Sequence, residues 1–389
     1  MKTRLINFVK YSPFVYKIYY YCGTFLLKFL RFIVRPDDNV ILFSSFGGRK
    51  FDDSPRDIYK QMITDERYND FKLVWAFQEP NKFENNKLNA IKTDGLKYYI
   101  TALKARVWVT NSSIERGLSF KGKKTLYFDT WHGTPLKKMG SDASENNKSF
   151  GSIGNWLVDV FTAQGEYEAK IFSNAFNIPL DNFAIIGLPR NDQLANYSIS
   201  ERNKIRANLG IDDDIKVILY APTFREYTQS SSGIRLELPI DFTKWKDRLK
   251  NKFLILFRAH YEVAKIMHIE ESEFIHDVSN YPVLNDLMIA SDILISDYSS
   301  IFFDYSIMDK PMLHFCYDYD LYEKERGMYF DIREWLPGAE NEDDLLDLLV
   351  NLNHKKSIQN TISFRDKYVT AYGNASKQSL DIIAKELEI

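Results

Sequence analysis

From residue 39 onward, short apolar runs of strand length alternate with stretches whose apolar residues recur every three or four positions. The short runs stay apolar at consecutive positions, which is typical of parallel strands covered on both faces. Helical spacing is clear at 54–66 and 166–177. The pattern therefore predicts an α/β fold. Strands are expected at 39–46, 72–78, 106–111, 124–133, 159–165, 182–190, 216–224, 253–261, 274–279, 292–300 and 311–318.

A polar segment at 191–214 divides the strand series into two halves of similar size. At 389 residues the chain is long enough for two hydrophobic cores. We therefore expect two Rossmann-like domains facing a cleft, with bounds 36–198 and 199–370. An amphipathic helix at 371–389 is expected to close the chain.

Residues 1–35 contain seven lysines and arginines and no acid, with aromatic and aliphatic residues between them. The longest uncharged stretch, 18–27, is about half the length that a spanning helix needs. No small-residue cleavage site of a signal peptide follows it. A basic, aromatic-rich segment of this kind predicts an amphipathic helix in the interface of an anionic membrane. A helix packed on the protein's own surface is the competing interpretation.

Composition narrows the class of protein. Apolar residues make up 45% and charged residues 27% of the chain, which is typical of a folded domain. A formal net charge of −2 gives the molecule no nucleic-acid-binding character. The two cysteines, Cys22 and Cys316, lie far apart and exclude a disulfide framework, which favours a reducing cytoplasm. No P-loop, dinucleotide-binding glycine motif or nucleophile elbow is present.

Candidate ligand-binding residues follow the predicted strands, because open α/β sheets bind ligands at the carboxyl ends of their strands. Two histidines, two arginines and several hydroxyl groups fall at such ends. In the first half these residues are Trp131, His132, Gly133, Thr134, Pro135 and Arg190. In the second half they are Pro222, Thr223, Arg258, Ala259, His260, Ser299 and Ser300.

His132 lies in the stretch "TWHGTPLKKMG", residues 130–140. Gly133 permits close approach of the backbone, and Pro135 suits the first turn of a helix. A neutral imidazole with a pKa of about 6.5 suits proton abstraction from a hydroxyl near neutral pH. A packed histidine beside Trp131 with no catalytic part is the competing interpretation.

The segment "SDYSSIFFDYSIMD" predicts an anion site. A strand ends at Asp297, and Ser299 and Ser300 are natural caps for the helix that follows. Backbone N–H groups at such a helix start bind phosphate. Asp304, one turn further along, is placed to reach a neighbouring hydroxyl of a ligand. An ordinary capped helix with no ligand is the competing interpretation, and Arg258 and His260 on the adjacent predicted strand favour the phosphate site. The acids at 318–320 suit a loop or, less well, a divalent metal.

Several motifs, in order, carry a resemblance to a known family. They are "TWHGTPLKKMG", "GLPRND", "YAPTFRE", "FRAH", "DVSNYPVLNDLMIASDILISDYSSIFFDYSIMDKPMLHF" and "YEKERGMYFD". Over residues 40–370 the chain resembles the CDP-glycerol glycerophosphotransferases of teichoic acid synthesis. The resemblance implies a two-domain GT-B-like fold, with an N-terminal acceptor-side domain and a C-terminal nucleotide-donor domain.

The resemblance also implies residue roles. His132 corresponds to the general base, and His260 to a second essential histidine at the phosphates. The donor is expected against Trp131 to Pro135, Arg190, Pro222, Thr223, Arg258, Ala259, Ser299, Ser300 and Asp304. No cofactor and no metal are implied. The "HGTP" form is similar to that of the chain-extending transferases, and the chain length favours addition of one or a few units.

The implied reaction moves glycerol phosphate from CDP-glycerol to a terminal hydroxyl of a polyprenyl-diphosphate-linked acceptor and releases CMP. The implied location is the cytoplasmic face of the cell membrane, as a peripheral protein. A CDP-ribitol transferase is a close variant that the sequence leaves open. The sequence is also compatible with a GT-B glycosyltransferase using a nucleotide-sugar and with a non-catalytic membrane-bound scaffold.

Overall fold

The computed structural model describes residues 12–143, 156–223, 225, 229–230, 233–234, 239–250, 252–259 and 271–389. Its contacts divide the chain into two compact units. The first unit comprises residues 1–132, 139–192 and 371–389, and the second comprises 133–138 and 193–370. Each unit carries its own parallel sheet and its own hydrophobic clusters.

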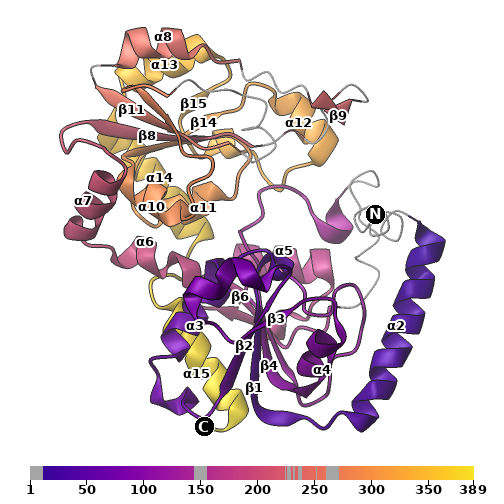
Figure 1. Cartoon of the computed structure of the whole chain (residues 1–389). Helices are drawn as coiled ribbons and strands as arrows, with labels where there is room; N and C mark the ends of the chain where they lie inside the picture. The colour runs from indigo at the N-terminus through magenta and orange to yellow at the C-terminus, as the bar shows by residue number, and fades with distance from the viewer. Residues whose placement is uncertain are drawn as a thin grey trace. The chain divides into compact units, whose positions relative to one another are not determined.

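Seven described strands form the parallel sheet of the first unit, in the order β3-β2-β1-β4-β5-β6-β7 (Figure 1). Chain order reverses between β1 and β4, so this is the switch point, where ligands bind outside the carboxyl ends. The strands are β1 (Asp37–Ser44), β2 (Lys72–Phe77), β3 (Ala90–Lys92), β4 (Ala105–Thr110), β5 (Leu126–Asp129), β6 (Val160–Ala163) and β7 (Phe183–Ile185).

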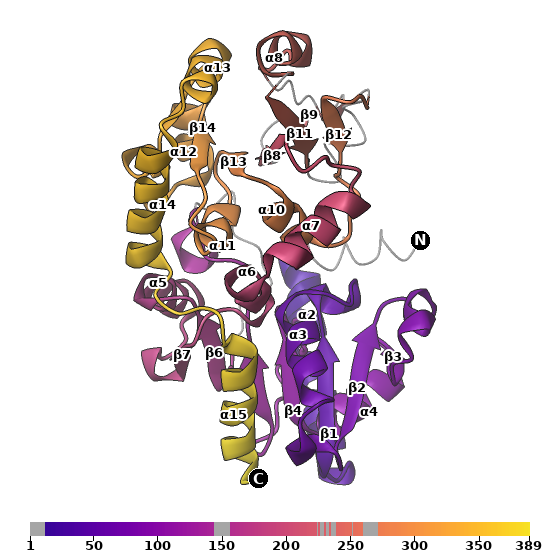
Figure 2. The same ribbon diagram turned by 90° about the vertical axis from the view of Figure 1, so that its left-hand side faces the viewer.

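Helices cover both faces of this sheet, because its strands are apolar on both sides. The helices are α2 (Pro13–Ile33), α3 (Asp53–Met62), α4 (Leu96–Lys104), α5 (Glu166–Phe176) and α15 (Ala375–Leu387). Helix α6 (Asp192–Asn196) begins at the last residue of the segment 139–192 and belongs otherwise to the second unit. Short 3-10 helices are η1 (Phe46–Gly48), η2 (Glu66–Tyr68), η3 (Pro80–Asn86), η4 (Gly140–Asp142), η7 (Leu180–Asn182) and η8 (Pro189–Asn191). The last helix of the chain, α15, lies beside α3 (Figures 1 and 2).

Six described strands form the parallel sheet of the second unit, in the order β12-β11-β8-β13-β14-β15. Here the switch point lies between β8 and β13. The strands are β8 (Lys216–Ala221), β11 (Phe253–Phe257), β12 (Ile275–Asp277), β13 (Ile293–Ser296), β14 (Met312–Phe315) and β15 (Gly338–Ala339). A separate antiparallel pair is β9 (Gln229–Ser230) and β10 (Gly233–Ile234).

The helices of the second unit follow its strands in alternation, as the sequence pattern predicts. They are α7 (Ile199–Asn208), α8 (Phe242–Leu249), α10 (Leu284–Ala290), α11 (Ile301–Ser306), α12 (Tyr319–Arg326), η10 (Ile332–Glu334), α13 (Glu342–Val350) and α14 (His354–Tyr368). The expected α/β fold of GT-B-like type, with a helical N-terminal segment, is confirmed. The domain bounds 36–198 and 199–370 stay predictions.

Helix α2 has one packed face and one open face. Tyr16, Thr24 and Leu27 are buried, and the Tyr16 hydroxyl donates to the carbonyl of Gly117 at 3.2 Å. At the other end Arg31 Nη1 donates to the carbonyl of Lys121 at 2.6 Å. The open face is apolar and carries Phe14, Ile18, Tyr21, Phe25, Phe29 and Phe32. Across the described residues, no helix combines the length and apolarity of a membrane crossing.

Candidate functional site

The turn after β5 places His132 at the switch point of the first unit. β5 ends at Asp129, and Trp131 follows with φ of 49°, a left-handed conformation that is costly for a large side chain. Asp129 Oδ1 accepts a hydrogen bond from the backbone N–H of Trp131 at 2.8 Å and so holds this turn. Burial raises the pKa of the Asp129 carboxyl well above its usual range.

The His132 ring is oriented by one hydrogen bond and two aromatic neighbours. Its Nδ1 lies 2.7 Å from the carbonyl oxygen of Asn111, the residue after β4. A carbonyl only accepts, so Nδ1 carries the proton and neutral His132 keeps an unprotonated Nε2. The Trp131 ring stacks on the His132 ring with 4.2 Å between their centroids, and the centroid of the Phe46 ring lies 5.6 Å from that of His132. The side chain remains exposed, and Nε2 is therefore the nitrogen able to take a proton.

The backbone after β1 lets Phe46 approach the histidine. Phe46, Gly47 and Gly48 all have positive φ in the η1 turn. A Cβ on Gly48 would lie 2.8 Å from Thr93 and 3.0 Å from the carbonyl oxygen of Ala76, so only glycine fits there. Phe46 N–H donates to the side-chain oxygen of Asn111 at 2.7 Å, which ties the turn to the residue that orients His132.

Charged neighbours adjust the proton affinity of His132. Although the ring has an open face, surrounding protein atoms displace water, and this desolvation lowers its pKa from the usual value. Asp53 acts in the opposite direction, whereas Arg190 and Arg49 lower the pKa further. A lowered pKa keeps His132 neutral near pH 7, which a general base requires.

Asp53 and Arg190 form a buried ion pair beside the histidine. Arg190 Nη1 lies 2.8 Å from Asp53 Oδ2, and both side chains are largely buried. Burial alone would raise the pKa of Asp53, but the charge and hydrogen bond of Arg190 and the backbone N–H of Ser54 together outweigh burial, and the pKa is lowered. Asp53 has φ of 64°, so the chain adopts a strained conformation at this residue. Arg190, a predicted donor-binding residue, thus lies in the first unit with a carboxylate partner.

The residues that follow His132 belong by their contacts to the second unit. Lys138 N–H donates to the carbonyl of Gly327 at 3.0 Å, and Tyr329 N–H donates to that of Leu136 at 3.0 Å. Thr134 and Pro135 are buried there. Of the predicted turn 131–135, Trp131 and His132 therefore lie in one unit and Gly133, Thr134 and Pro135 in the other.

The second unit brings its own predicted residues to the ends of β8 and β13. Thr223 N–H donates to Asp297 Oδ1 at 2.9 Å, and Pro222 precedes it in the same turn. The buried hydroxyl of Thr223 has no hydrogen-bond partner among the described residues. A buried hydroxyl of this kind at a switch point is a natural contact for a ligand.

A buried arginine, Arg225, fixes these two strand ends. It lies 2.8 Å from Asp297 Oδ2 and is paired through two hydrogen bonds to Asp318. The rings of Tyr298 and Tyr322 lie 4.9 and 5.0 Å from the guanidinium carbon. Asp318 belongs to the acids weighed as metal ligands, and here it binds Arg225. The described residues contain no group of acids, histidines and cysteines suited to hold a metal.

Other predicted residues are partly engaged within the second unit. Arg258 Nη1 donates to the carbonyls of Val278 at 3.2 Å and Tyr281 at 2.8 Å, and Ala259 N–H donates to Ser279 Oγ at 3.0 Å. His260 lies outside the described residues.

The helix cap after β13 uses Ser299. Its hydroxyl oxygen accepts from Ile301 N–H at 3.2 Å, whereas Ser300 makes no such capping bond. Asp304 is buried within α11. The parts of Ser299, Ser300 and Asp304 in binding stay predictions.

Three residues around these sites were not among the predicted set, namely Asp53, Asn111 and Arg225. Arg225 lies inside the motif "YAPTFRE", directly after a predicted strand, which is a usable signal. Asp53 lies 137 positions from its partner Arg190, and nothing local marks it. Asn111 orients His132 through its backbone carbonyl, which any residue type possesses, and its side-chain oxygen holds Phe46, a partner 65 positions away that nothing local marks.

Two α/β units with parallel sheets and polar groups at both switch points are typical of the GT-B-like fold, and one switch point bears a histidine with an available Nε2. Comparison with known proteins gives the family. Residues 26–385 match the model of the CDP-Glycerol:Poly(glycerophosphate) glycerophosphotransferase family, and the chain belongs to that family. It is accordingly an enzyme of the glycerophosphotransferase class in teichoic acid biosynthesis.

Relatives span nearly the whole chain. The teichoic acid poly(glycerol phosphate) polymerase of Bacillus spizizenii is 30% identical over 98% of this chain and 99% of its own. The teichoic acid glycerol-phosphate transferase of Staphylococcus aureus is 32% identical over 90% and 94%. A structure of the wall teichoic acid polymerase TagF with CDPG is 32% identical, with a TM-score of 0.81 over 91% of this chain and 90% of that one.

Proposed function

We propose that this enzyme transfers glycerol phosphate from CDP-glycerol to the terminal hydroxyl of a polyprenyl-diphosphate-linked teichoic acid acceptor and releases CMP. The observation that carries the proposal is the His132 ring, whose Nδ1 is committed to the Asn111 carbonyl and whose Nε2 is available. Relatives that extend or transfer glycerol phosphate, and the TagF structure with CDPG, support CDP-glycerol as the donor.

The proposed reaction is a phosphoryl transfer. The acceptor hydroxyl gives its proton to His132 Nε2 while its oxygen forms a bond to the glycerol-bearing phosphorus. The bond from that phosphorus to the bridging oxygen breaks, and CMP leaves with the electron pair. Charge on the phosphates is stabilised by Arg258, His260 and the Ser299–Ser300 turn, because electrostatic stabilisation dominates such reactions.

The proposed place of action is the cytoplasmic face of the cell membrane, where the enzyme binds peripherally. Support comes from α2, which exposes a continuous apolar face and carries Lys17 and Lys28 among its exposed residues. An amphipathic helix of this kind is held at an anionic membrane surface by apolar burial and by charge. A polyprenyl-linked acceptor is confined to the same surface.

The test is CMP release by the purified full chain, given CDP-glycerol and a lipid-linked acceptor analogue, with CDP-ribitol in a parallel reaction. We expect acceptor-dependent CMP from CDP-glycerol. His132→Ala is expected to lose at least about a hundredfold in kcat, since a general base contributes that much or more. Binding of CDP-glycerol to this variant, measured by calorimetry, is expected to persist.

His354→Ala is the matched control, because His354 contacts Lys216 at the amino end of β8, the opposite end from Thr223. Its activity is expected to equal that of the unaltered enzyme. Full turnover by His132→Ala contradicts the role of the histidine. CMP released only from CDP-ribitol would show that the donor is CDP-ribitol. Release of a nucleoside diphosphate from a nucleotide-sugar would show that the enzyme is a glycosyltransferase.

A further inference from the structure

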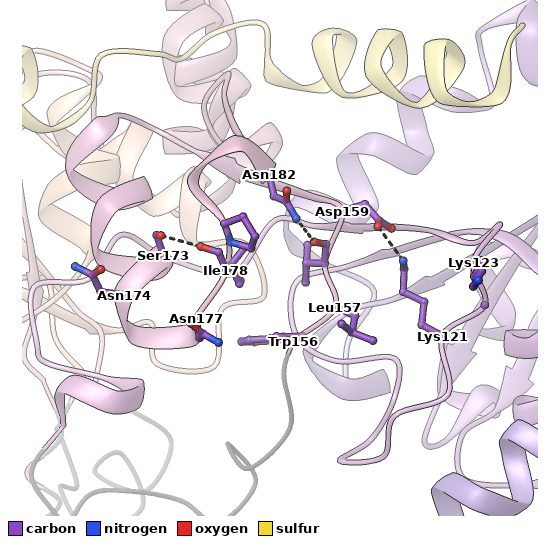
Figure 3. A pocket seen from close by; sticks show the side chains of 13 residues that line it. Lys121, Lys123, Trp156, Leu157, Asp159, Ser173, Asn174, Asn177, Ile178 and Asn182 are labelled. Atoms are coloured by element: carbon purple, nitrogen blue, oxygen red, sulfur yellow. Dashed lines mark hydrogen bonds and ion pairs between the residues drawn. The ribbon is translucent and has the colours of Figure 1, made fainter.

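A pocket of about 840 Å³ opens in the first unit, apart from the His132 turn. Figure 3 shows its lining, which comes from the segment before β5, the segment before β6 and the end of α5. Both strands begin at the pocket, so it lies at the amino end of the sheet, whereas His132 lies at the carboxyl end. Lysines, amides and one tryptophan line it together.

Hydrogen bonds within the unit fix the walls of the pocket. Asp159 accepts from Lys121 Nζ at 2.8 Å and from Tyr127 N–H at 2.7 Å, so the Lys121 charge is already compensated. Asn182 donates to the carbonyl of Val158 at 2.7 Å, and Ser173 donates to that of Ile178 at 2.7 Å. The hydrogen-bonding groups of these residues are used within the protein, so a ligand would bind through other residues of the lining.

Three polar side chains of the lining are exposed and available for a ligand. Lys123 has no ion pair with any residue that the structure describes, and the side-chain amides of Asn174 and Asn177 make no hydrogen bond within that set. Asn177 ends α5 in a left-handed conformation, with φ of 54°. A cation, two amides and the Trp156 ring suit a ligand that combines phosphate charge with sugar hydroxyls.

The position of the pocket indicates which ligand this is. One side adjoins the C-terminal end of α2, where Arg31 donates to the carbonyl of Lys121 at 2.6 Å. On the other side the Trp156 ring packs edge-on against the Trp131 ring, with 5.3 Å between centroids, and the Trp131 ring stacks on His132 with 4.2 Å between centroids. β5 has 4 residues, so its two ends are about 10 Å apart, a separation that an extended ligand spans.

We propose that this pocket binds the sugar-phosphate head of the lipid-linked acceptor while the acceptor's terminal hydroxyl reaches His132. The proposal rests on the proposed function and names the acceptor subsite of that same reaction. The lipid end of the head then lies beside α2, and Trp156, which lines the pocket, contacts Trp131 next to His132. Lys123 pairs with phosphate, and Asn174 and Asn177 bind sugar hydroxyls.

The test compares two acceptors in the CMP-release assay with the full chain. One is a short-chain polyprenyl-diphosphate disaccharide that ends in glycerol phosphate, and the other is an alkyl glycerol phosphate without diphosphate or sugar. Lys123→Glu is expected to raise the KM of the first acceptor about tenfold, since it replaces an attraction to phosphate by a repulsion. The KM of the second acceptor and of CDP-glycerol stays unchanged.

Lys124→Glu is the matched control, because Lys124 is exposed, is the next residue along the chain and does not line the pocket. It is expected to leave all three KM values unchanged. Asn177→Gly removes the amide while keeping the left-handed conformation accessible, and it is expected to raise only the KM of the first acceptor.

The outcomes separate the two proposals. Unchanged KM for the first acceptor in Lys123→Glu, with normal CMP release, overturns the subsite and leaves the proposed function intact. Equal effects of Lys123→Glu and Lys124→Glu also overturn it. Binding to phosphatidylglycerol vesicles without acceptor tests whether Lys123 instead binds lipid headgroups. Equal loss of vesicle binding in Lys123→Glu and Lys124→Glu would assign both lysines to general attraction to the membrane and would contradict the subsite.

Discussion

His132 lies among charged residues with opposite effects on its proton affinity, and this makes the base testable by pH. A base acts when unprotonated, so activity rises with pH through its pKa. Since desolvation lowers the pKa of His132, the rising limb of kcat/KM is expected below pH 6.5. Asp53→Asn removes a group that raises this pKa, so the limb is expected to move to lower pH.

Arg190→Gln is the complementary variant, because Arg190 lowers the pKa of His132 and its removal is expected to move the limb to higher pH. Asp52→Asn is the control, since Asp52 pairs with Arg56 at 3.0 Å and is not among the charges that act on His132. The measurement is a pH–rate profile of each variant with its melting temperature. Limbs that stay in place in both variants contradict a titrating His132.

Arg225 shows how a single buried charge holds a strand-end site. Its removal leaves Asp297, also buried, without its counter-charge, which typically costs about 3–5 kcal/mol. Arg225→Met is therefore expected to lower the unfolding free energy of the second unit by about that amount in urea titration. Arg248→Met, which breaks an exposed pair with Asp347, is expected to cost about 1 kcal/mol or less. Equal losses of unfolding free energy in Arg225→Met and Arg248→Met would contradict a larger contribution of the buried Arg225 pair to stability.

Elements with strong periodicity were predictable from sequence, and short or unmarked ones were not. Strands β1 and β2 lie close to where the apolar runs placed them, whereas β8 and β11 begin at the predicted residues and end earlier, at Ala221 and Phe257. The strand predicted at 124–133 ends earlier, at Asp129, because the chain turns through a left-handed Trp131. β3 has 3 residues, too few for a periodic signal, and α4 passes directly into β4 without a turn residue to mark the boundary.

Helix α2 allows membrane binding to be separated from folding. Phe25 and Phe29 are 74% and 54% exposed on its open face, whereas Leu27 is 5% exposed and packs in the core. Phe25→Glu with Phe29→Glu is expected to abolish sedimentation with phosphatidylglycerol vesicles and to leave the melting temperature unchanged. Leu27→Glu is expected to destabilise the fold by several kcal/mol, about the cost of burying an unpaired charge. Full vesicle binding by the double variant contradicts a membrane role for α2.

Across the whole molecule, the strand-end rule located much of the candidate site but not its partners. Thr223 and His132 were predictable because both follow apolar strands at switch points. Asp53 pairs with Arg190 beside His132. Asp318 pairs with Arg225, which donates to the carbonyl of Thr223. These partners come from other parts of the chain, and only folding brings them together. Sequence order therefore indicates which side chains lie at the strand ends, whereas the charges around them follow from tertiary packing.

The two units have separate hydrophobic clusters, so a ligand held by one unit stabilises that unit by mass action. CDP-glycerol at a hundred times its Kd is expected to add about 2.7 kcal/mol to the second unit, on the order of 5–10 °C in its transition. Hydrogen exchange assigns the stabilised unit. Thr223→Val removes a buried hydroxyl without a described partner, so stability without ligand is preserved while the CDP-glycerol shift falls. If CDP-glycerol raises the transition temperature of Thr223→Val as much as that of the unaltered enzyme, the donor does not contact Thr223. Protection from hydrogen exchange confined to the first unit would place the donor in that unit.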